Sequence, residues 1–318
     1  MNCNFNRTII RLVCTASLLV ICASDVLAQR IAILTTDSLT ATKRTISGAR
    51  KVIRSEHPDA VFSRYFLSSD HTQQAKQVNQ IKAEKPDIIL TVGSAGTRIA
   101  KEHFSRTPIV FSAVLYPVIS GFVKSLSNPG ENITGASLNI PADIQFRNFR
   151  KIIPNLKTIG VLYTSNTARL IPPSKVVAKR MGMRLVAVEV NNERELPGAL
   201  DSLAKVCDGI WSVADPNLFS PQATKFILLR TIRRGIPFMG FSRNVVESGA
   251  LFALDFDYKA VGRQAGEIIN RILDGTAPRK IPVSSPDIIW FHYNEKTAQH
   301  INVVIPDELV AVAKEVYR

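Results

Sequence analysis

The segment Gly93-Ser94-Ala95-Gly96-Thr97 has the residue types of an anion-binding turn. It follows an apolar run over 87–92 that is typical of a β-strand, and it precedes a stretch with the pattern of a helix. Small residues let a ligand approach the backbone, and free N–H groups at a helix N-terminus favour a carboxylate. No Gly-Lys-Ser/Thr follows, so the turn is not a Walker loop. The alternative is that Ser94 only caps the helix.

Other hydroxyl, amide and aromatic side chains follow the remaining predicted strands. Ligands of open α/β sheets bind beyond the carboxyl ends of the strands, where such groups hold a small molecule by hydrogen bonds and stacking. The candidate ligand-binding residues are Thr36, Ser94, Ala95, Thr97, Ser112, Ala113, Tyr116, Tyr163, Asp215, Asn217 and Ser242.

The sequence lacks the residue patterns of an enzyme. Its histidines are expected on helices or at helix ends, without metal-ligand spacing, and they are His57, His71, His103, His292 and His300. No Gly-x-Ser-x-Gly motif is present. Asp255 and Asp257 alternate on a connecting segment, so we expect hydrogen bonding at a hinge rather than acid–base chemistry. Cys207 is interpreted as a small buried hydrophobe. We therefore predict no catalytic residues, no metal and no cofactor.

The elements that would position these residues alternate between apolar runs and helical stretches. In the first half, strands are expected over 31–36, 60–66, 87–92 and 108–114, and helices over 41–56, 72–84 and from about Ala95. The pattern restarts after Asn139, with strands over 158–164, 184–190, 209–213 and 237–241 and helices over 142–153, 172–182, 194–204 and 221–234. Continuous Ile, Val and Leu runs between helices are typical of parallel sheets covered on both faces. We predict an α/β protein with two doubly wound, Rossmann-like lobes.

No Gly/Ser-rich linker separates the two lobes. The segments expected to cross between them are 137–143, 253–258 and 281–287. Several short crossings would form a hinge that permits closure around a ligand. The predicted organisation is a signal peptide over 1–28, lobe one over 29–139 and 256–284, and lobe two over 140–255 and 285–318.

The N-terminus has the pattern of a secretory signal peptide. Arg7 and Arg11 give it a positive flank, and the apolar run over 12–24 is short for a membrane span. Cleavage is expected after Ala28, so the mature chain would begin at Gln29 in the periplasm. An uncleaved anchor is the alternative.

The whole chain carries a formal net charge of +14 over 318 residues. Its basic residues are scattered, and no run is longer than a pair such as Lys43-Arg44, Arg50-Lys51, Lys179-Arg180 or Arg233-Arg234. No zinc-finger, helix-turn-helix or RNA-binding signature accompanies them, so we predict no nucleic-acid partner. A solvated basic surface facing anionic lipid headgroups is the preferred interpretation.

Two long segments resemble a known family: PIVFSAVLYPVISGFVKSLSNPGENITGAS (108–137) and FRKIIPNLKTIGVLYTSN (149–166). They are similar to substrate-binding proteins of ABC importers in the tryptophan/aromatic-amino-acid-associated group. Later segments agree: ADPNLF (214–219), RRGIPFMGFSRNVVESGALFAL (233–254), DYKAVGRQAGEIINRILDGTAPRKIPV (257–283) and IPDELVAVAKEVY (305–317). The resemblance implies the type I periplasmic-binding-protein fold. It also implies an extracytoplasmic receptor that closes on a small ligand and docks on a membrane permease.

The resemblance also bears on the site. In this group, the loops matching 93–97 and Ser112–Ala113 grip the carboxylate end of the ligand. The positions matching Asp215, Asn217 and Ser242 face them from the second lobe. Relatives that bind amino acids often have Thr-Asp-Pro where this chain has Leu115-Tyr116-Pro117. The missing carboxylate removes a partner for an α-ammonium group, and Tyr116 favours a ligand that stacks.

We therefore expect a monomeric solute-binding receptor that delivers a small organic ligand, amino-acid-like or an aromatic acid, to an ABC permease. A sensor read by a membrane histidine kinase or chemoreceptor is the alternative. The acidic end of the ligand would lie at the amides of Ser94 to Thr97, and its body against Tyr116 and Tyr163. A neutral sugar or nucleoside, with both tyrosines in hinge packing, is the other possibility.

Overall fold

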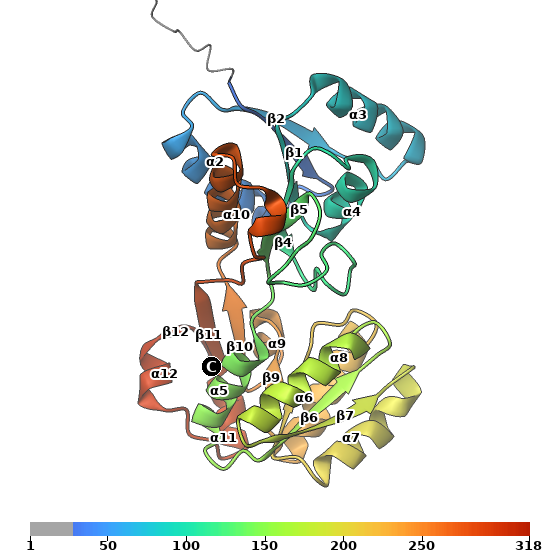
Figure 1. The fold of residues 1–318 in the computed structure, drawn as a ribbon. Helices are drawn as coiled ribbons and strands as arrows, with labels where there is room; N and C mark the ends of the chain where they lie inside the picture. The colour runs from blue at the N-terminus through green and yellow to red at the C-terminus, as the bar shows by residue number, and fades with distance from the viewer. Residues whose placement is uncertain (1–27) are drawn as a thin grey trace, which may run out of the picture.

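A computed structural model describes residues 28–318 as two lobes, each built around one β-sheet (Figure 1). Apart from Ala28, the predicted signal peptide lies outside the described residues. The prediction of an α/β fold with two doubly wound lobes is confirmed. Within residues 28–318, no helix has the length and apolar character needed to cross a membrane.

Lobe one contains a five-stranded parallel sheet in the order β2-β1-β3-β4-β5. Its strands are β1 (Arg30–Thr35), β2 (Val61–Phe66), β3 (Ile88–Val92), β4 (Ile109–Val114) and β5 (Ile133–Ser137). Its helices are α2 (Thr40–Glu56), α3 (His71–Glu84), α4 (Ser94–His103) and α10 (Tyr258–Leu273). Apolar side chains of α2 and α10 pack on one face of the sheet, and those of α3 and α4 pack on the other.

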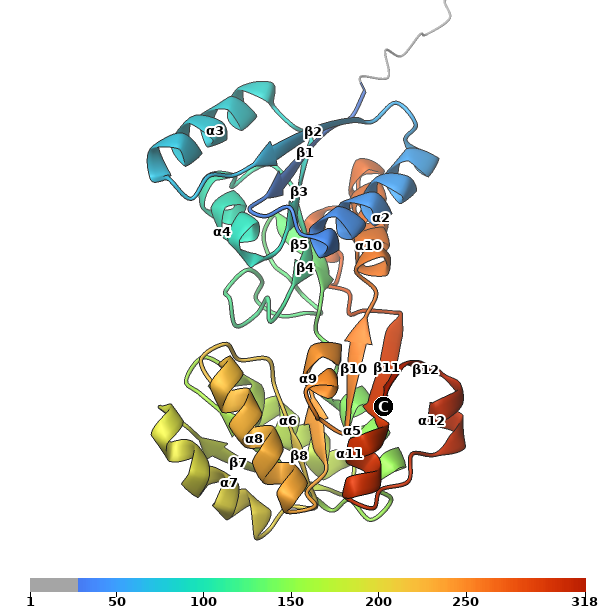
Figure 2. The same ribbon diagram turned by 180° about the vertical axis from the view of Figure 1, so that it is seen from behind.

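Helix α10 returns to lobe one from a distant part of the sequence because it packs closely on α2 (Figure 2). Two glycines permit the contact. A Cβ atom at Gly262 would collide with the backbone oxygen of Thr45, and one at Gly48 would collide with that of Lys259. The backbones of the two helices therefore approach each other closely at Gly48 and Gly262, where no side chain separates them.

Lobe two contains a seven-stranded sheet in the order β12-β11-β10-β9-β8-β6-β7. Its strands are β6 (Thr158–Tyr163), β7 (Arg184–Glu189), β8 (Gly209–Trp211), β9 (Phe238–Gly240), β10 (Phe252–Phe256), β11 (Ile289–Asn294) and β12 (Ala313–Tyr317). Its helices are α5 (Ala142–Ile152), α6 (Ile171–Arg180), α7 (Leu196–Ala204), α8 (Pro221–Arg233), α9 (Arg243–Glu247), α11 (Glu295–His300) and α12 (Asp307–Ala311). Strand β11 runs antiparallel to β10, and the other pairs are parallel.

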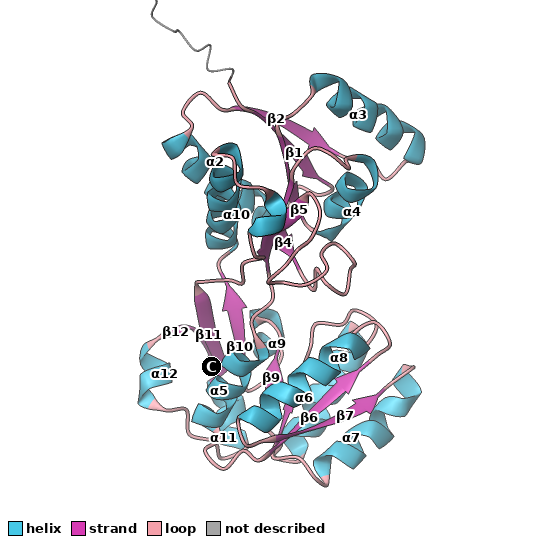
Figure 3. Ribbon diagram, viewed as in Figure 1, coloured by secondary structure: helices cyan, strands magenta, loops and turns pink. Residues whose placement is uncertain are grey.

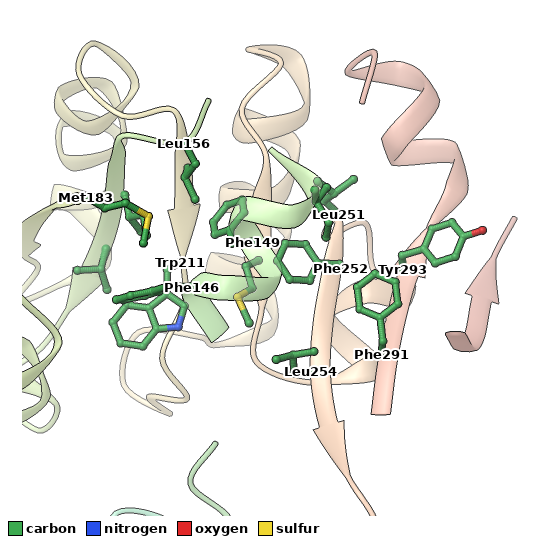
Figure 4. Close-up of a cluster of buried hydrophobic side chains, with 14 of the residues drawn as sticks. Phe146, Phe149, Leu156, Met183, Trp211, Leu251, Phe252, Leu254, Phe291 and Tyr293 are labelled. Atoms are coloured by element: carbon green, nitrogen blue, oxygen red, sulfur yellow. The ribbon is translucent and has the colours of Figure 1, made fainter. Parts of the chain in front are cut away.

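An aromatic cluster forms the core between α5 and the sheet of lobe two (Figure 4). The rings of Phe149 and Phe252 meet edge to face with centroids 5.2 Å apart. Phe146 meets Trp211 at 5.1 Å and a near-perpendicular angle. Since α5 is the first helix after the crossing from lobe one, this packing fixes where the hinge enters lobe two.

The expected position of His292 is wrong. It was expected on a helix or at a helix end, but it lies in β11, opposite Ala253 of β10. The strands β11 and β12 were not expected either, because both follow the long return segment after α10. The side chain of His292 is buried, and this burial lowers its pKa.

The chain crosses between the lobes at the ends of three ordered elements (Figure 3). It leaves β5 at Ser137 and enters α5, and it leaves β10 at Phe256 and enters α10. It returns after Ser284, which bridges to Ala136 beside the sheet of lobe one, and enters β11. Residues 253–256 of the expected crossing 253–258 thus belong to β10, and the chain crosses between the lobes only after Phe256. The boundaries predicted at 139/140, 255/256 and 284/285 stay a prediction.

Candidate ligand-binding site

A cavity of about 330 Å³ lies beside the hinge and is lined from both lobes. Lobe one contributes the turn after β4 and the segment after β5, and lobe two contributes α5, α6 and the ends of β8, β9 and β10. Its aromatic and polar lining includes Tyr116, Asn139, Gln145, Trp211, Phe241 and Phe256. Asp143 is the only charged residue among the lining residues, which belong to the described part of the chain.

Tyr116 of lobe one reaches toward lobe two. Its backbone has a φ of 52°, and its N–H donates to Oδ1 of Asn139 over 2.8 Å. Burial raises the pKa of the Tyr116 phenol to about 12. The backbone of Ala214 lowers that pKa by hydrogen bonding to the phenol, and the nearby Asp215 carboxylate raises it. The structure therefore places this predicted residue on the cavity wall, with its hydroxyl protonated at neutral pH.

Trp211 also lines the cavity, from the end of β8, and is held in one orientation. Its indole N–H donates to Oε1 of Gln145 over 2.7 Å, and its ring packs on Phe146. The amide of Gln145 also donates to the backbone oxygen of Ile140 over 2.7 Å. A rigid aromatic surface of this kind can stack on another ring at little cost in side-chain entropy.

The predicted anion-binding turn stands at the carboxyl end of β3, next to the strand that leads to Tyr116. Gly93 has a φ of 83° and precedes α4, so Ser94 is the first helical residue and does not cap the helix. Ser94 is half-buried and Ala95 is exposed. The hydroxyl of Thr97 is buried, donates to the oxygen of Gly93 over 2.8 Å and lies 2.7 Å from the Thr91 hydroxyl. The Thr97 side chain is therefore engaged inside lobe one.

Three other predicted residues of lobe one surround this edge without lining the cavity. The Ser112 hydroxyl is buried and donates to the oxygen of Val261 in α10 over 3.4 Å. Ala113 is half-buried with a φ of 56°. Thr36 is half-buried directly after β1. Their contact with a ligand stays a prediction.

In lobe two, Asp215 is buried and accepts three hydrogen bonds. The hydroxyls of Thr164 and Thr167 donate to its Oδ2 over 2.6 and 2.7 Å, and the backbone N–H of Asn217 donates to Oδ1 over 3.0 Å. The Asp215 carboxylate therefore organises the turns after β6 and β8. Asn217 itself lines a separate hollow of about 90 Å³.

The remaining two predicted residues of lobe two also lie outside the cavity lining. Burial raises the pKa of Tyr163, and the carboxylate of Glu189 on the neighbouring strand raises it further. The Tyr163 side chain thus lies beside Glu189 of β7, the last strand of the sheet, and is not brought together with Tyr116. Ser242 is half-buried at the N-terminus of α9 and follows Phe241 of the cavity wall.

The expected hinge role of the two aspartates has a structural counterpart. Oδ2 of Asp255 accepts from the backbone N–H of Arg243 over 3.3 Å. Asp257 caps α10 by accepting from the N–H of Lys259, and it pairs with Arg44 at 2.9 Å. Within residues 28–318, no group of three or more His, Cys, Asp or Glu side chains has the arrangement of a metal site.

Several cavity residues were missed by sequence reasoning, notably Trp211, Gln145 and Phe241. The run that contains Trp211 was interpreted as a strand over 209–213, whereas β8 ends at residue 211. The side chain therefore lies at the carboxyl end of its strand, where ligands bind. An aromatic residue near the end of a short apolar run was the available signal.

Two α/β lobes with a cavity between them and several parallel crossings define a two-lobed binding protein of the type I periplasmic-binding-protein fold. A family model for ABC transporter substrate-binding proteins matches residues 30–317. The chain belongs to that family, which confirms the family predicted from the resemblance.

Solved structures share this fold. A ligand-free, open substrate-binding protein with adhesive properties from Clostridium difficile superimposes with a TM-score of 0.75 at 22% identity. An ABC domain from Streptococcus pneumonia in complex with L-Trp superimposes with a TM-score of 0.64, also at 22% identity. Each comparison covers 91% of this chain and 99% of the other.

Two curated proteins are similar in sequence. The tyrosine-binding protein of Clostridioides difficile is 27% identical over 225 residues, which are 70% of this chain and 64% of that protein. The match thus spans less than two thirds of that relative. An uncharacterized protein of Rickettsia prowazekii is 26% identical over 235 residues, covering 73% of this chain and 72% of that protein.

Proposed function

We propose that this chain is an extracytoplasmic receptor that holds one small organic ligand between its lobes and delivers it to an ABC importer permease. The observation that carries the proposal is the cavity beside the hinge, which is lined by Tyr116 of lobe one and by Trp211 and Phe241 of lobe two. Family membership supports the link to import. The receptor would act as a monomer.

The two lobes would move as rigid bodies. Lobe one would consist of 29–139 and 256–284, and lobe two of 140–255 and 285–318. Residues of all three crossings line the cavity. Rotation about these crossings would therefore close the lobes on a ligand without breaking either sheet. Closure would bring the turns at Ser94 and Asp215 toward one another.

The ligand is proposed to carry an aromatic ring and an acidic or strongly accepting end. Its ring would stack on Tyr116 and Trp211, because the cavity wall is mostly apolar, includes aromatic side chains and holds a single charged residue. Its acidic end would lie at the free amides of the α4 N-terminus. The tyrosine named for one relative and the L-Trp bound to another are consistent with a ligand of this class.

A thermal-shift screen of the mature protein tests the proposal. We expect L-Tyr, L-Trp or aromatic acids without an amine to raise Tm, because a ligand at a hundred times its Kd adds about 2.7 kcal/mol of stability. Phe241→Ala should abolish the shift. The control Phe226→Ala, at an exposed position of α8 outside the cavity lining, should keep it. A shift by sugars alone, or turnover of the ligand, would contradict the proposal.

Import is tested separately from binding. Vesicles that contain the permease and its ATPase should accumulate the ligand only when the receptor is present. Binding without stimulated uptake, together with ligand-dependent activation of a membrane kinase, would support the sensory role instead.

A further inference from the structure

Five basic side chains gather on the outer side of lobe one around a hollow of about 460 Å³. Lys43, Arg50, Lys51 and Arg54 come from α2, and Arg64 comes from β2. We name these five residues the α2 basic face. Arg50 is half-buried and the other four are exposed. Figures 1 and 2 show α2 at the periphery of lobe one, next to α10.

The ring of Phe62 contacts two of these basic side chains, Arg50 and Arg54. The guanidinium carbons of Arg50 and Arg54 lie 5.0 and 5.4 Å from the centroid of the Phe62 ring. Like charges four residues apart on a helix repel, and the ring offsets this repulsion by cation–π attraction. Phe62 and Arg64 are two residues apart on β2, so both side chains lie on the same face of the sheet. The guanidinium groups are thus held near one another at the surface.

The charge of this face is not compensated within the described residues. No member of the α2 basic face forms an ion pair there. Glu56, the last residue of α2, is the only acidic residue of that helix. By contrast, Arg263 of the adjoining α10 pairs with both Glu267 and Asp287. The difference indicates that α2 presents its cations to an anionic partner.

We propose that the α2 basic face binds the phosphate-bearing headgroups of an anionic lipid bilayer. Guanidinium groups bind phosphate oxygens in pairs, and ammonium groups add to the attraction. Lys43 and Arg54 are about 16 Å apart along the helix, so the face spans several headgroups rather than one anion. Ile46 is the only apolar residue lining the hollow and is 6% exposed, so a protein partner would find no apolar anchor there.

The lipid surface would hold the receptor near a membrane without occupying its ligand cavity. None of the five residues lines the cavity between the lobes. Binding would weaken with salt, because exposed charges are screened over about 8–10 Å at moderate ionic strength.

Co-sedimentation of the mature protein with vesicles tests the proposal. We expect binding to vesicles of phosphatidylglycerol and phosphatidylcholine in equal parts, and none to pure phosphatidylcholine. The variant Lys43→Gln/Lys51→Gln/Arg54→Gln should bind more weakly by a factor on the order of a hundred, since each cation near an anionic surface contributes separately. Glutamine forms helices well, so α2 should remain intact.

A matched control removes the same charge from lobe two. Lys175→Gln/Lys179→Gln/Arg180→Gln changes three exposed cations of α6 and should leave vesicle binding close to that of the unchanged protein. Equal loss in both variants would show that net charge alone matters and would overturn the proposal. Absence of binding, or release by inorganic phosphate at constant ionic strength, would overturn it as well.

Discussion

The indole N–H of Trp211 lies 2.7 Å from Oε1 of Gln145, and this hydrogen bond joins a wall of the cavity between the lobes to the first helix of lobe two. Trp211 belongs at the same time to the aromatic core in Figure 4. Its orientation in the cavity is therefore set by the packing of α5 on the sheet. Trp211 thus belongs both to the cavity wall and to the core of lobe two, as do Val213 and Leu254.

Gln145→Met should destabilise the protein by about 1–3 kcal/mol, because the buried indole N–H loses its acceptor. Trp211→Phe removes the donor, so the double variant should cost less than the sum of the single variants. Urea unfolding of the three variants gives the coupling free energy. Additive costs would show that the bond contributes nothing to stability.

Gly262→Ala should destabilise lobe one by about 1–3 kcal/mol or more, because the new Cβ would collide with the Thr45 oxygen and separate α10 from α2. Gly198→Ala is the control, since a Cβ there meets no atom within 4 Å. At this position in α7, alanine should leave stability unchanged or raise it. Thermal unfolding of both variants measures the effect on Tm, which should fall for Gly262→Ala and stay or rise for Gly198→Ala.

The sequence pattern identified β1 to β4 of lobe one and β6 to β9 of lobe two because continuous apolar runs reflect burial on both faces of a sheet. It did not identify β5, and it interpreted most of β10 as a segment that crosses between the lobes. It also predicted that Tyr116 lies at the edge that faces lobe two, because residues at the carboxyl end of β4 must lie there, and Tyr116 lines the cavity. Trp211 was missed because its partner Gln145 is 66 residues away, and only the packing of α5 on β8 brings them together. The antiparallel β11 was missed because nothing local marks a strand that returns beside β10.

Stability should fall as pH rises from about 10 to 12. In the folded state, burial raises the pKa of Tyr116 to about 12, so the phenol keeps its proton in this range while the unfolded chain loses it. Ionisation then favours the unfolded state by about 1.4 kcal/mol per pH unit. Tyr116→Phe should make the decline less steep. The pKa values of Tyr65 and Tyr317 are also raised to about 12, so these residues should account for part of the decline in stability that remains in Tyr116→Phe.

Export should remove the signal peptide after Ala28, so the mature chain should begin at Gln29. Intact-mass analysis of the protein recovered from the periplasm measures this directly. A mass that retains Met1 would instead indicate the uncleaved anchor. A protein found only in the membrane fraction with Gln29 at its N-terminus would point to the α2 basic face.

Ser94→Pro should weaken the binding of an acidic ligand without unfolding α4. Ser94 is the first helical residue, where proline is tolerated because the N–H has no partner within the helix. The preceding Gly93 has a ψ of 163°, an extended value close to the range that proline favours in the residue before it. The substitution removes one backbone donor from the proposed carboxylate site. A hydrogen bond to a charged group contributes about 1.5–3 kcal/mol, which corresponds to a loss of affinity of about ten- to a hundredfold.

Calorimetry measures the binding of an aromatic acid, and of its uncharged amide, to the unchanged protein and to Ser94→Pro. The acid should lose affinity and the amide should lose less. Equal affinities for the acid in both proteins would place the acidic end away from the α4 N-terminus.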